Sequence, residues 1–175
     1  MSDYSVAITG ATGKTGRNVV STALGRGWQV RALSRQPAAR GQWIPFDWDD
    51  QRSWSLAFAG SDAAYILIPF NHPGAPEKTP DLIRSAAASG VERIVLLSSL
   101  DAEHAPENSA LRVCESALLE AAVHGAVLRP TWFLDNFTTG SFASMIDSGE
   151  LRYRPAPGVS RSSIPETSPR SLSRR

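Results

Sequence analysis

Several features are scarce or absent in this chain of 175 residues. It has a single cysteine, Cys114, so it cannot form an internal disulfide bond, and one thiol fits a reducing compartment. No run of 18 apolar residues occurs, and residues 1–20 lack the layout of a signal peptide. No set of metal ligands accompanies Cys114, which we interpret as a small buried hydrophobe. These absences predict a cytoplasmic protein with neither a membrane span nor a metal site.

Charge is unevenly distributed along the chain. The last 25 residues hold six arginines and one acidic residue, for a net charge of +5, whereas the other 150 residues sum to −4. A mildly acidic body gives no electrostatic reason for nucleic-acid binding. Residues 151–175 are also rich in serine and proline and have almost no apolar periodicity, which predicts a disordered tail. A nucleic-acid-binding arm is the alternative interpretation of this tail.

The strongest local signal lies in residues 5–20. An apolar run leads into Gly10, Gly13 and Gly16, which are spaced three residues apart, and an amphipathic run follows. This order predicts a strand, a tight turn and a helix N-terminus, the arrangement that cradles a dinucleotide pyrophosphate. A glycine-rich turn between two ordinary elements is the alternative, but the position at the start of the chain favours the dinucleotide site.

Apolar runs alternate with helical patterns along the rest of the chain. The predicted strands are residues 5–9, 29–33, 43–46, 63–68, 93–98 and 126–129. The predicted helices are residues 14–26, 51–58, 79–88 and 110–124, and Gly27, Gly90 and Gly125 are the expected stops of three of them. This alternation predicts an α/β fold, a doubly wound parallel sheet of about six strands with ligands at the carboxyl ends of the strands.

Three segments occur in a specific order and spacing: the glycine motif at residues 10–16, Leu-Leu-Ser-Ser at 96–99, and Leu-Arg-Pro-Thr-Trp-Phe-Leu-Asp-Asn-Phe at 128–137. With them the chain resembles the NmrA-like and quinone-oxidoreductase-like branch of the atypical short-chain dehydrogenase/reductase superfamily. The resemblance implies an NAD(P)-binding Rossmann domain over residues 1–150. It also implies a further substrate region, so we expect a C-terminally truncated member of the family.

The resemblance suggests an origin for the tail. If the serine codons are of the TCN type, a shifted reading frame from Ser160 onward permits Phe-Val-Asp-Pro-Gly-Asp-Ile-Ala. That segment is similar to one that follows this position in relatives. We therefore hypothesise that residues from about 155 onward are read out of frame, which an open continuation of the gene in the shifted frame would support.

The end of the predicted second strand bears on the choice of cofactor. NAD-preferring Rossmann domains usually place an acidic residue there on the ribose 2′-hydroxyl, whereas this strand is followed by Ser34 and Arg35. Because a guanidinium matches phosphate oxygens in bidentate fashion, Arg35 predicts NADP, with NADPH preferred over NADH. Lys14 would add to the phosphate site. An ordinary exposed arginine and a solvated lysine are the alternatives.

The resemblance extends this site. Asp47 resembles an adenine-contacting position, and a helix N-cap ahead of residue 51 is its alternative role. The expected cofactor-binding residues are Gly10, Thr12, Gly13, Lys14, Thr15, Gly16, Ser34, Arg35, Asp47, Ile68, Pro69, Ser98 and Pro130. The expected substrate-binding residues are Phe70, Trp132, Phe133 and Asn136. Each of three residues has an alternative role. Ser98 could equally satisfy backbone hydrogen bonds, Phe133 could pack in the core, and Asn136 could cap a helix.

No catalytic residue is assigned. Many members of the superfamily use a Tyr-x-x-x-Lys pair, and the register set by Glu115 puts Asn108 and Arg112 at those positions. Asparagine cannot donate the proton, and arginine stays protonated, which disfavours carbonyl reduction by the usual pair. Hydride transfer to a quinone demands less of the protein, because the cofactor carries the chemistry. His72 is an acid–base candidate whose alternative is an exposed loop histidine.

Three functions follow from these observations. The first is an NADPH-dependent oxidoreductase acting on a quinone-like or other electron-poor small molecule. The second is a redox-sensing regulator that binds the dinucleotide without turnover and controls a protein partner. The third is an inactive truncated form. We expect a small-molecule substrate and no nucleic-acid or membrane partner. The resemblance implies a further strand and helices after residue 150, and loss of these elements would expose apolar surface, which predicts low solubility or a homodimer.

Overall fold

The centre of the sheet is β1 (Ser5–Thr9), which pairs with β2 (Gln29–Ser34) on one side and β4 (Ala63–Leu67) on the other. The computed structural model describes residues 3–69, 72, 74–131, 133, 138 and 142–149. The chain divides into two units, Met1–Thr131 and Trp132–Arg175. The first unit holds the sheet, and the second holds the short helix α6 (Ala143–Asp147).

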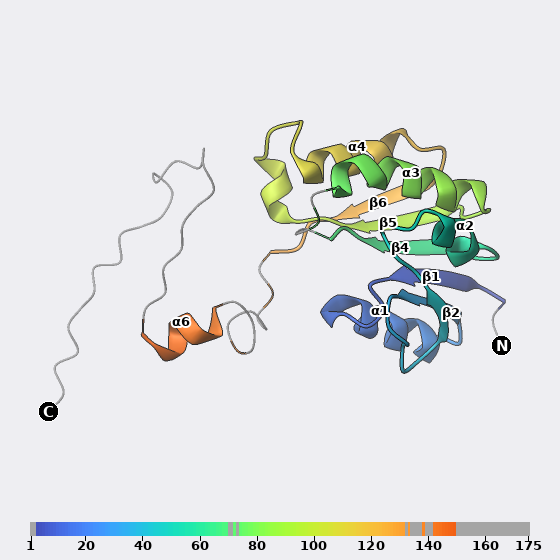
Figure 1. The fold of residues 1–175 in the computed structure, drawn as a ribbon, viewed down its shortest axis with the longest axis horizontal. Coiled ribbons are helices and arrows are strands. Elements are labelled where there is room, and N and C mark those ends of the chain that lie inside the picture. Colours follow the sequence, from blue (N-terminus) through green and yellow to red (C-terminus); the bar gives the residue numbers. More distant parts are fainter. Residues whose placement is uncertain are drawn as a thin grey trace, which may run out of the picture. The chain divides into compact units, whose positions relative to one another are not determined.

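Six strands pair in parallel in the order β3-β2-β1-β4-β5-β6 (Figure 1). The remaining strands are β3 (Gln42–Pro45), β5 (Arg93–Leu97) and β6 (His124–Leu128). The order reverses between β1 and β4, and open α/β sheets bind their ligands at such a switch point. The predicted α/β fold with a parallel sheet of six strands is confirmed.

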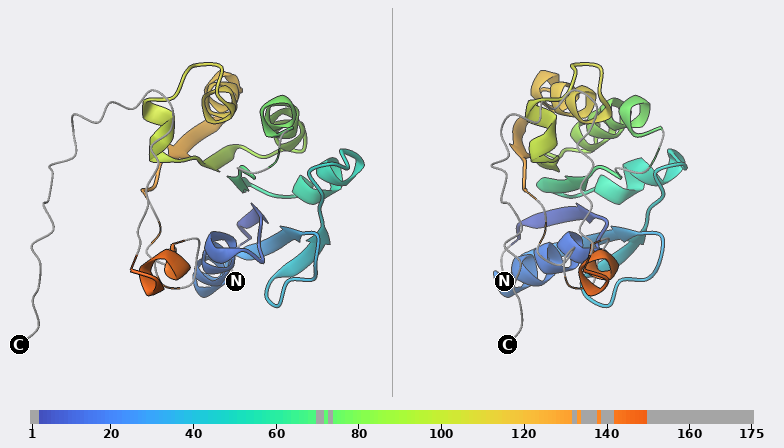
Figure 2. Two further views of the ribbon diagram at one scale, coloured as in Figure 1. Left: turned by 60° about the vertical axis from the view of Figure 1, so that its left-hand side comes forward. Right: turned by 90° about the vertical axis from the view of Figure 1, so that its left-hand side faces the viewer.

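Helices cover both faces of this sheet (Figures 1 and 2). Their bounds are α1 (Lys14–Gly25), α2 (Arg52–Phe58), α3 (Ala75–Ala88), the 3-10 helix η1 (Leu100–Glu103) and α4 (Ala110–Glu120). Val6 and Ile8 pack with α1 on one face, whereas Ala7 belongs to the core formed with α2, α3 and α4 on the other. Alternation of side chains along each strand therefore produces two cores, as a doubly wound sheet requires.

The lone cysteine lies in the core beneath α4. Cys114 is fully buried among the residues that join α3 and α4 to the sheet. Burial raises the pKa of its thiol, and a hydrogen bond with Thr79 acts in the opposite direction. The interpretation of Cys114 as a small buried hydrophobe is confirmed.

One predicted helix is too long. α4 ends at Glu120, because Ala121 adopts an extended backbone (φ −72°, ψ 145°) and His124 begins β6 by pairing with Arg93. Gly125 lies inside β6 and is not a helix stop. Tertiary strand pairing here outweighs a local sequence of good helix formers.

Another predicted helix is too short. α3 begins at Ala75, four residues before the predicted start, with a proline in its first turn and Pro80 inside the helix. Proline is tolerated in a first turn because its missing N–H would have no helical partner there. Gly90, in contrast, ends α3 as predicted, with a φ of +96°.

Candidate functional site: a cavity at the glycine turn

The turn between β1 and α1 contains three glycines, two of which its geometry requires. Gly10 has a φ of +61°, and a Cβ on it would lie 2.7 Å from the side chain of Leu67. The N–H of Gly13 donates to the carbonyl oxygen of Gly10 at 2.8 Å, and a Cβ on Gly16 would overlap that same oxygen. Only glycine fits at positions 10 and 16. The predicted strand, tight turn and close helix packing are confirmed.

The N-terminus of α1 opens beside this turn. Gly13 is its N-cap residue and has an extended backbone, and no described side chain caps the helix. Lys14 and Arg17 lie in the first turn and are exposed. Uncapped N–H groups and two cations are therefore presented together, an arrangement that suits a phosphate.

A cavity of about 280 Å³ lies at the carboxyl ends of β1, β2 and β4. It is lined by Gly10, Thr12, Gly13, Leu33, Ser34, Arg35, Phe46, Asp47, Trp48, Asp49, Leu67, Pro69 and His72. The fold thus brings together seven of the expected cofactor-binding residues, namely Gly10, Thr12, Gly13, Ser34, Arg35, Asp47 and Pro69. A larger hollow of about 660 Å³, lined by residues of α3 and α4, contains none of the expected site residues.

Other expected cofactor-binding residues lie beside the cavity or apart from it. Lys14, Thr15 and Gly16 belong to the first turn of α1, where Thr15 shares a hydrogen bond with the buried Tyr65. Ile68 is 1% exposed and packs in the core beneath α2 and α3. The side chain of Ile68 therefore faces away from the cavity that its neighbour Pro69 lines.

Ser98 directly follows β5, one strand beyond β4, and Pro130 lies two residues after the end of β6, the next strand in the sheet. Ser98 is buried, and its hydroxyl donates to the carboxylate of Glu115. The carbonyl of Pro130 accepts a hydrogen bond from the Leu100 N–H at 3.0 Å. These two residues do not line the cavity.

The structure describes one of the four expected substrate-binding residues, Phe133. Phe70, Trp132 and Asn136 lie outside the described residues. Phe133 belongs to the second unit and is 41% exposed. The substrate assignments therefore stay predictions.

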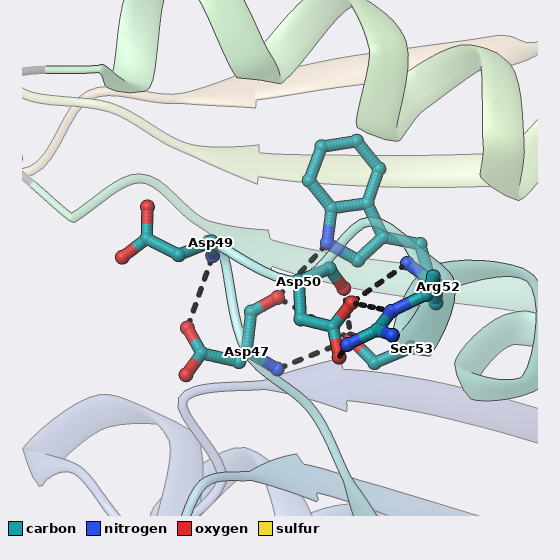
Figure 3. Close-up of polar contacts among 6 residues, drawn as sticks. Asp47, Asp49, Asp50, Arg52 and Ser53 are labelled. Carbon is teal, nitrogen blue, oxygen red and sulfur yellow. Dashed lines mark hydrogen bonds and ion pairs between the residues drawn. The ribbon is translucent and has the colours of Figure 1, made fainter.

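Asp47 opens the turn that leads from β3 to α2 (Figure 3). Its carboxylate accepts the backbone N–H of Asp49 at 3.0 Å, and its carbonyl accepts the indole N–H of Trp54 at 3.0 Å. α2 begins at Arg52, after an N-cap Gln51 that makes no side-chain capping bond. The helix-capping alternative for Asp47 is wrong, and this side chain lies on the cavity wall instead.

A cluster of charged side chains borders the cavity at Asp49. The Nε2 atom of His72 lies 3.1 Å from both carboxylate oxygens of Asp49, and Lys78 pairs with the same carboxylate. Hydrogen bonds from Lys78 and His72 lower the pKa of Asp49. The cluster ties the turn after β3 to the segment between β4 and α3, so His72 serves here as part of the cavity wall.

Cations on the β1–α1–β2 side of the cavity have no acidic neighbour in sequence. Residues 4–46 contain no Asp or Glu. The side chains of Lys14, Arg17 and Arg35 are exposed, and no hydrogen bond or ion pair joins these side chains to another described residue. The hydroxyl of Ser34 donates to the Gln36 carbonyl at 2.6 Å, which leaves Arg35 as the charged group at the end of β2. This side of the cavity therefore attracts anions.

The residues at the positions of a Tyr-x-x-x-Lys pair, and the buried Tyr65, do not form a catalytic pair. Asn108 is exposed ahead of α4, and the Nη1 atom of Arg112 lies 3.7 Å from the carboxylate of Glu115. Tyr65 is buried, which raises the pKa of its hydroxyl. These placements provide no tuned proton donor of the usual kind.

Five cavity residues were not predicted: Leu33, Phe46, Trp48, Asp49 and Leu67. Leu33 lies one residue before the end of β2, Phe46 follows β3, and Leu67 is the last residue of β4. A rule that places ligands at strand ends would therefore have found them. Trp48 and Asp49 directly follow Asp47, which was predicted. Their proximity to the glycine turn depends on how the β3–α2 turn folds back.

Two further structural findings concern the described part of the chain. None of its helices is both long enough and apolar enough to cross a membrane. Within the same residues, no three His, Cys, Asp or Glu side chains are grouped so as to hold a metal ion.

Comparison with known proteins shows the family to which this chain is similar. A model of the NAD(P)H-binding family matches residues 10–166. An uncharacterized oxidoreductase of Bacillus subtilis is 27% identical over 178 residues, covering 94% of this chain and 60% of the relative. The chain spans about half the length of the curated relatives it matches.

Solved structures show the same fold. An NADPH-dependent quinone oxidoreductase from Escherichia coli, solved with NADPH, is 25% identical, with a TM-score of 0.68 over 82% of this chain and 54% of that one. NmrA, a negative transcriptional regulator, is 16% identical, with a TM-score of 0.60 over 71% of this chain and 44% of that one.

The residues of the cavity fit a nicotinamide dinucleotide. Glycine is required at Gly10 and Gly16, the N-terminus of α1 is uncapped, and the nearby cations Lys14, Arg17 and Arg35 have no partner among the described residues. These are the features that a pyrophosphate needs from a protein. The chain belongs to the NAD(P)H-binding family, and its resemblance to the NmrA-like and quinone-oxidoreductase-like branch of the atypical short-chain dehydrogenase/reductase superfamily is confirmed.

Proposed function

We propose that this chain binds NADPH in preference to NADH and belongs to an oxidoreductase that transfers hydride to a quinone-like or other electron-poor small acceptor. Two features together carry the proposal: no acidic residue follows β2, and the cations around the glycine turn have no side-chain partner among the described residues. Lys14 and Arg17 lie at the N-terminus of α1, and Arg35 lines the cavity. A polyanionic cofactor supplies the negative charge that this region lacks.

Arg35 discriminates between the two cofactors. An acidic residue after β2 would hydrogen-bond a 2′-hydroxyl and repel a 2′-phosphate, whereas the Arg35 guanidinium favours the phosphate. A hydrogen bond to a charged group contributes about 1.5–3 kcal/mol. The corresponding preference for NADPH is about ten- to a hundredfold.

The acceptor follows from what the protein lacks. When bound, the nicotinamide would supply the hydride, and the chain's own residues would hold and orient the cofactor. Asn108 and Arg112 stand where a tuned proton donor pair would be needed for a carbonyl substrate. A quinone-like acceptor demands less proton transfer from the protein, and the structural neighbour from Escherichia coli is a quinone oxidoreductase.

A second candidate function is a redox-sensing regulator that binds the dinucleotide without turnover. It is favoured by the engagement of Arg112 with Glu115 and by the absence of a tyrosine seven residues before Glu115. In this case the NADPH-to-NADP⁺ ratio would set the affinity for a protein partner.

The first experiment is a titration of the purified chain with NADPH and with NADH, read by nicotinamide fluorescence and thermal melting. Tighter saturable binding of NADPH supports the proposal, and equal affinities would remove the role of Arg35. A quinone panel, followed by loss of nicotinamide absorbance, then separates turnover from regulation. Binding of NADPH without turnover of any quinone would favour the regulator.

A further inference from the structure

A buried carboxylate on α4 joins the ends of two strands. Glu115 is 2% exposed. Its Oε1 atom accepts the Ser98 hydroxyl and the Nε–H of Arg129 at 3.0 Å, and its Oε2 atom accepts Nη2–H of Arg129 at 2.6 Å. Arg112 approaches the same carboxylate at 3.7 Å. This cluster of Glu115, Ser98, Arg129 and Arg112 is called the Glu115 cluster below.

The cluster spans adjacent elements of the sheet. Ser98 follows β5, Arg129 follows β6, and Glu115 projects from α4, which covers both strands. The backbone ladder continues past the strand ends, because Ser98 N–H donates to the Leu128 carbonyl at 2.8 Å and Leu100 N–H donates to the Pro130 carbonyl at 3.0 Å. The carboxyl ends of β5 and β6 are thus fixed to each other and to the helix behind them.

Side-chain alternation sets which residues face away from Glu115. Ser98 and Arg129 point toward α4, so their neighbours Ser99 and Pro130 lie on the opposite side of the extended backbone. Ser99 has φ −143° and ψ 153°, and its hydroxyl accepts the Asp101 N–H at 3.3 Å. The Glu115 cluster therefore determines where these two neighbours stand at the sheet's ligand-binding edge.

Simple core packing does not require this arrangement. Burial alone would raise the pKa of Glu115, but hydrogen bonds from Arg129 and Ser98 outweigh it and lower the pKa. Replacing a buried ion pair by apolar residues of similar volume is often neutral or stabilising, so ion pairs of this kind are retained for geometry in some proteins. A bidentate arginine–carboxylate pair fixes direction as well as distance.

We propose that Glu115 is a positioning residue of the nicotinamide half of the cofactor site. The inference rests on the proposed function. A doubly wound sheet binds a dinucleotide across its switch point, one mononucleotide on each side. The glycine turn and Arg35 belong to the β1–β2 side, so the other nucleotide lies toward the ends of β4, β5 and β6. The Glu115 cluster fixes the ends of β5 and β6, and none of its hydrogen bonds or ion pairs among the described residues involves the glycine turn or Arg35 on the β1–β2 side.

The test separates the two halves of the ligand. NADPH and adenosine 2′,5′-bisphosphate, which lacks the nicotinamide half, are titrated against the wild-type chain, Glu115→Gln, Arg129→Lys and Glu120→Gln. Glu120 lies on the same helix and is exposed, so its substitution is the matched control. Nicotinamide fluorescence of bound NADPH reports whether the ring is held.

We expect Glu115→Gln to weaken NADPH about tenfold and to reduce the fluorescence gain of the bound ring, while the affinity for the bisphosphate changes less than about twofold. Arg129→Lys, which keeps the charge but loses the bidentate geometry, should show the same pattern more weakly. If the Glu115→Gln variant does not melt cooperatively, the Arg129→Lys variant tests the inference in its place. The control should resemble the wild type with both ligands.

Other outcomes overturn the inference. Equal weakening of both ligands would make the Glu115 cluster a general structural element, and unchanged NADPH binding in both variants would give it no role at the site. A wild-type chain that binds neither ligand would overturn the proposed function and this inference with it. Wild-type binding with unaltered variants would overturn the inference alone.

Discussion

Two consecutive regions of the sheet unit differ in their acidic residues and in whether their cations form ion pairs. Residues 4–46, from β1 to β3, contain six cations and no acid, whereas residues 47–131 contain six cations and twelve acids. Every cation of the second region pairs with a carboxylate within it: Arg52, Lys78, Arg84, Arg93, Arg112 and Arg129. No ion pair involves a described cation of the first region.

The difference distinguishes cations that are bonded within the protein from cations that are available to bind an anionic ligand. In the first region Arg31 donates to carbonyls at the end of α2, Arg26 lies over the Trp28 ring, and Arg40 donates to a serine. Lys14, Arg17 and Arg35 are left, and they surround the glycine turn. Like charges without counter-ions repel one another, so a region of this kind is stabilised when an anion binds.

The largest effect is expected from filling the glycine turn. Gly16→Val places a side chain where the Gly10 carbonyl already stands, so NADPH binding should be lost beyond detection and stability should fall by about 3 kcal/mol. Gly25→Ala is the matched control in the same helix, because nothing lies within 4 Å of its Cβ. The control should gain about 0.5–1 kcal/mol. Equal melting temperatures for the two variants would contradict the described turn.

The Glu115 cluster tests the paired region. Glu115→Gln should lower the free energy of unfolding by about 3 kcal/mol at neutral pH, since it leaves Arg129 without its charged partner. The folded-state pKa of Glu115 is below its ordinary value of 4.5, so the stabilisation is present above pH 4.5 and is lost as the pH falls through the folded value. Denaturant unfolding from pH 7 to pH 3 should show a smaller acid loss in the variant. Parallel pH curves would refute this account.

Arg35 tests the unpaired region. Arg35→Ala should weaken NADPH about ten- to a hundredfold and leave NADH unchanged, because only the 2′-phosphate is lost as a partner. Arg84→Ala is the control, as Arg84 is already paired with Asp81 on α3. Isothermal titration with both cofactors measures the effect. A similar loss for NADH would mean that Arg35 contacts another part of the dinucleotide.

The smallest effects are expected at the rim. Lys14→Gln and Arg17→Gln should each weaken NADPH about two- to fivefold, because exposed charges interact through solvent. The loss should shrink as salt rises, since screening reduces such interactions. Arg93→Gln, a substitution in the paired region, should have no effect on binding. Titrations at low and high ionic strength separate these cases.

The sequence predicted the elements well wherever local patterns decide them. The spacing of Gly10, Gly13 and Gly16 after an apolar run identified the turn, and the order of runs gave the parallel sheet. Prediction was wrong where a distant contact outweighs local preference. Residues 121–124 continue a helical pattern, yet His124 pairs with Arg93 in the sheet.

Sequence alone determined the glycine turn, the acid-free end of β2 and the identity of Arg35, because each depends on residues close together in the chain. Only the tertiary structure decided the partners of Glu115, which lie 17 and 14 positions away at Ser98 and Arg129. It also brought His72 and Lys78 to Asp49, across 23 and 29 positions. Backbone preference and hydrophobic period act over a few residues, whereas these contacts form only when strands pair and helices pack.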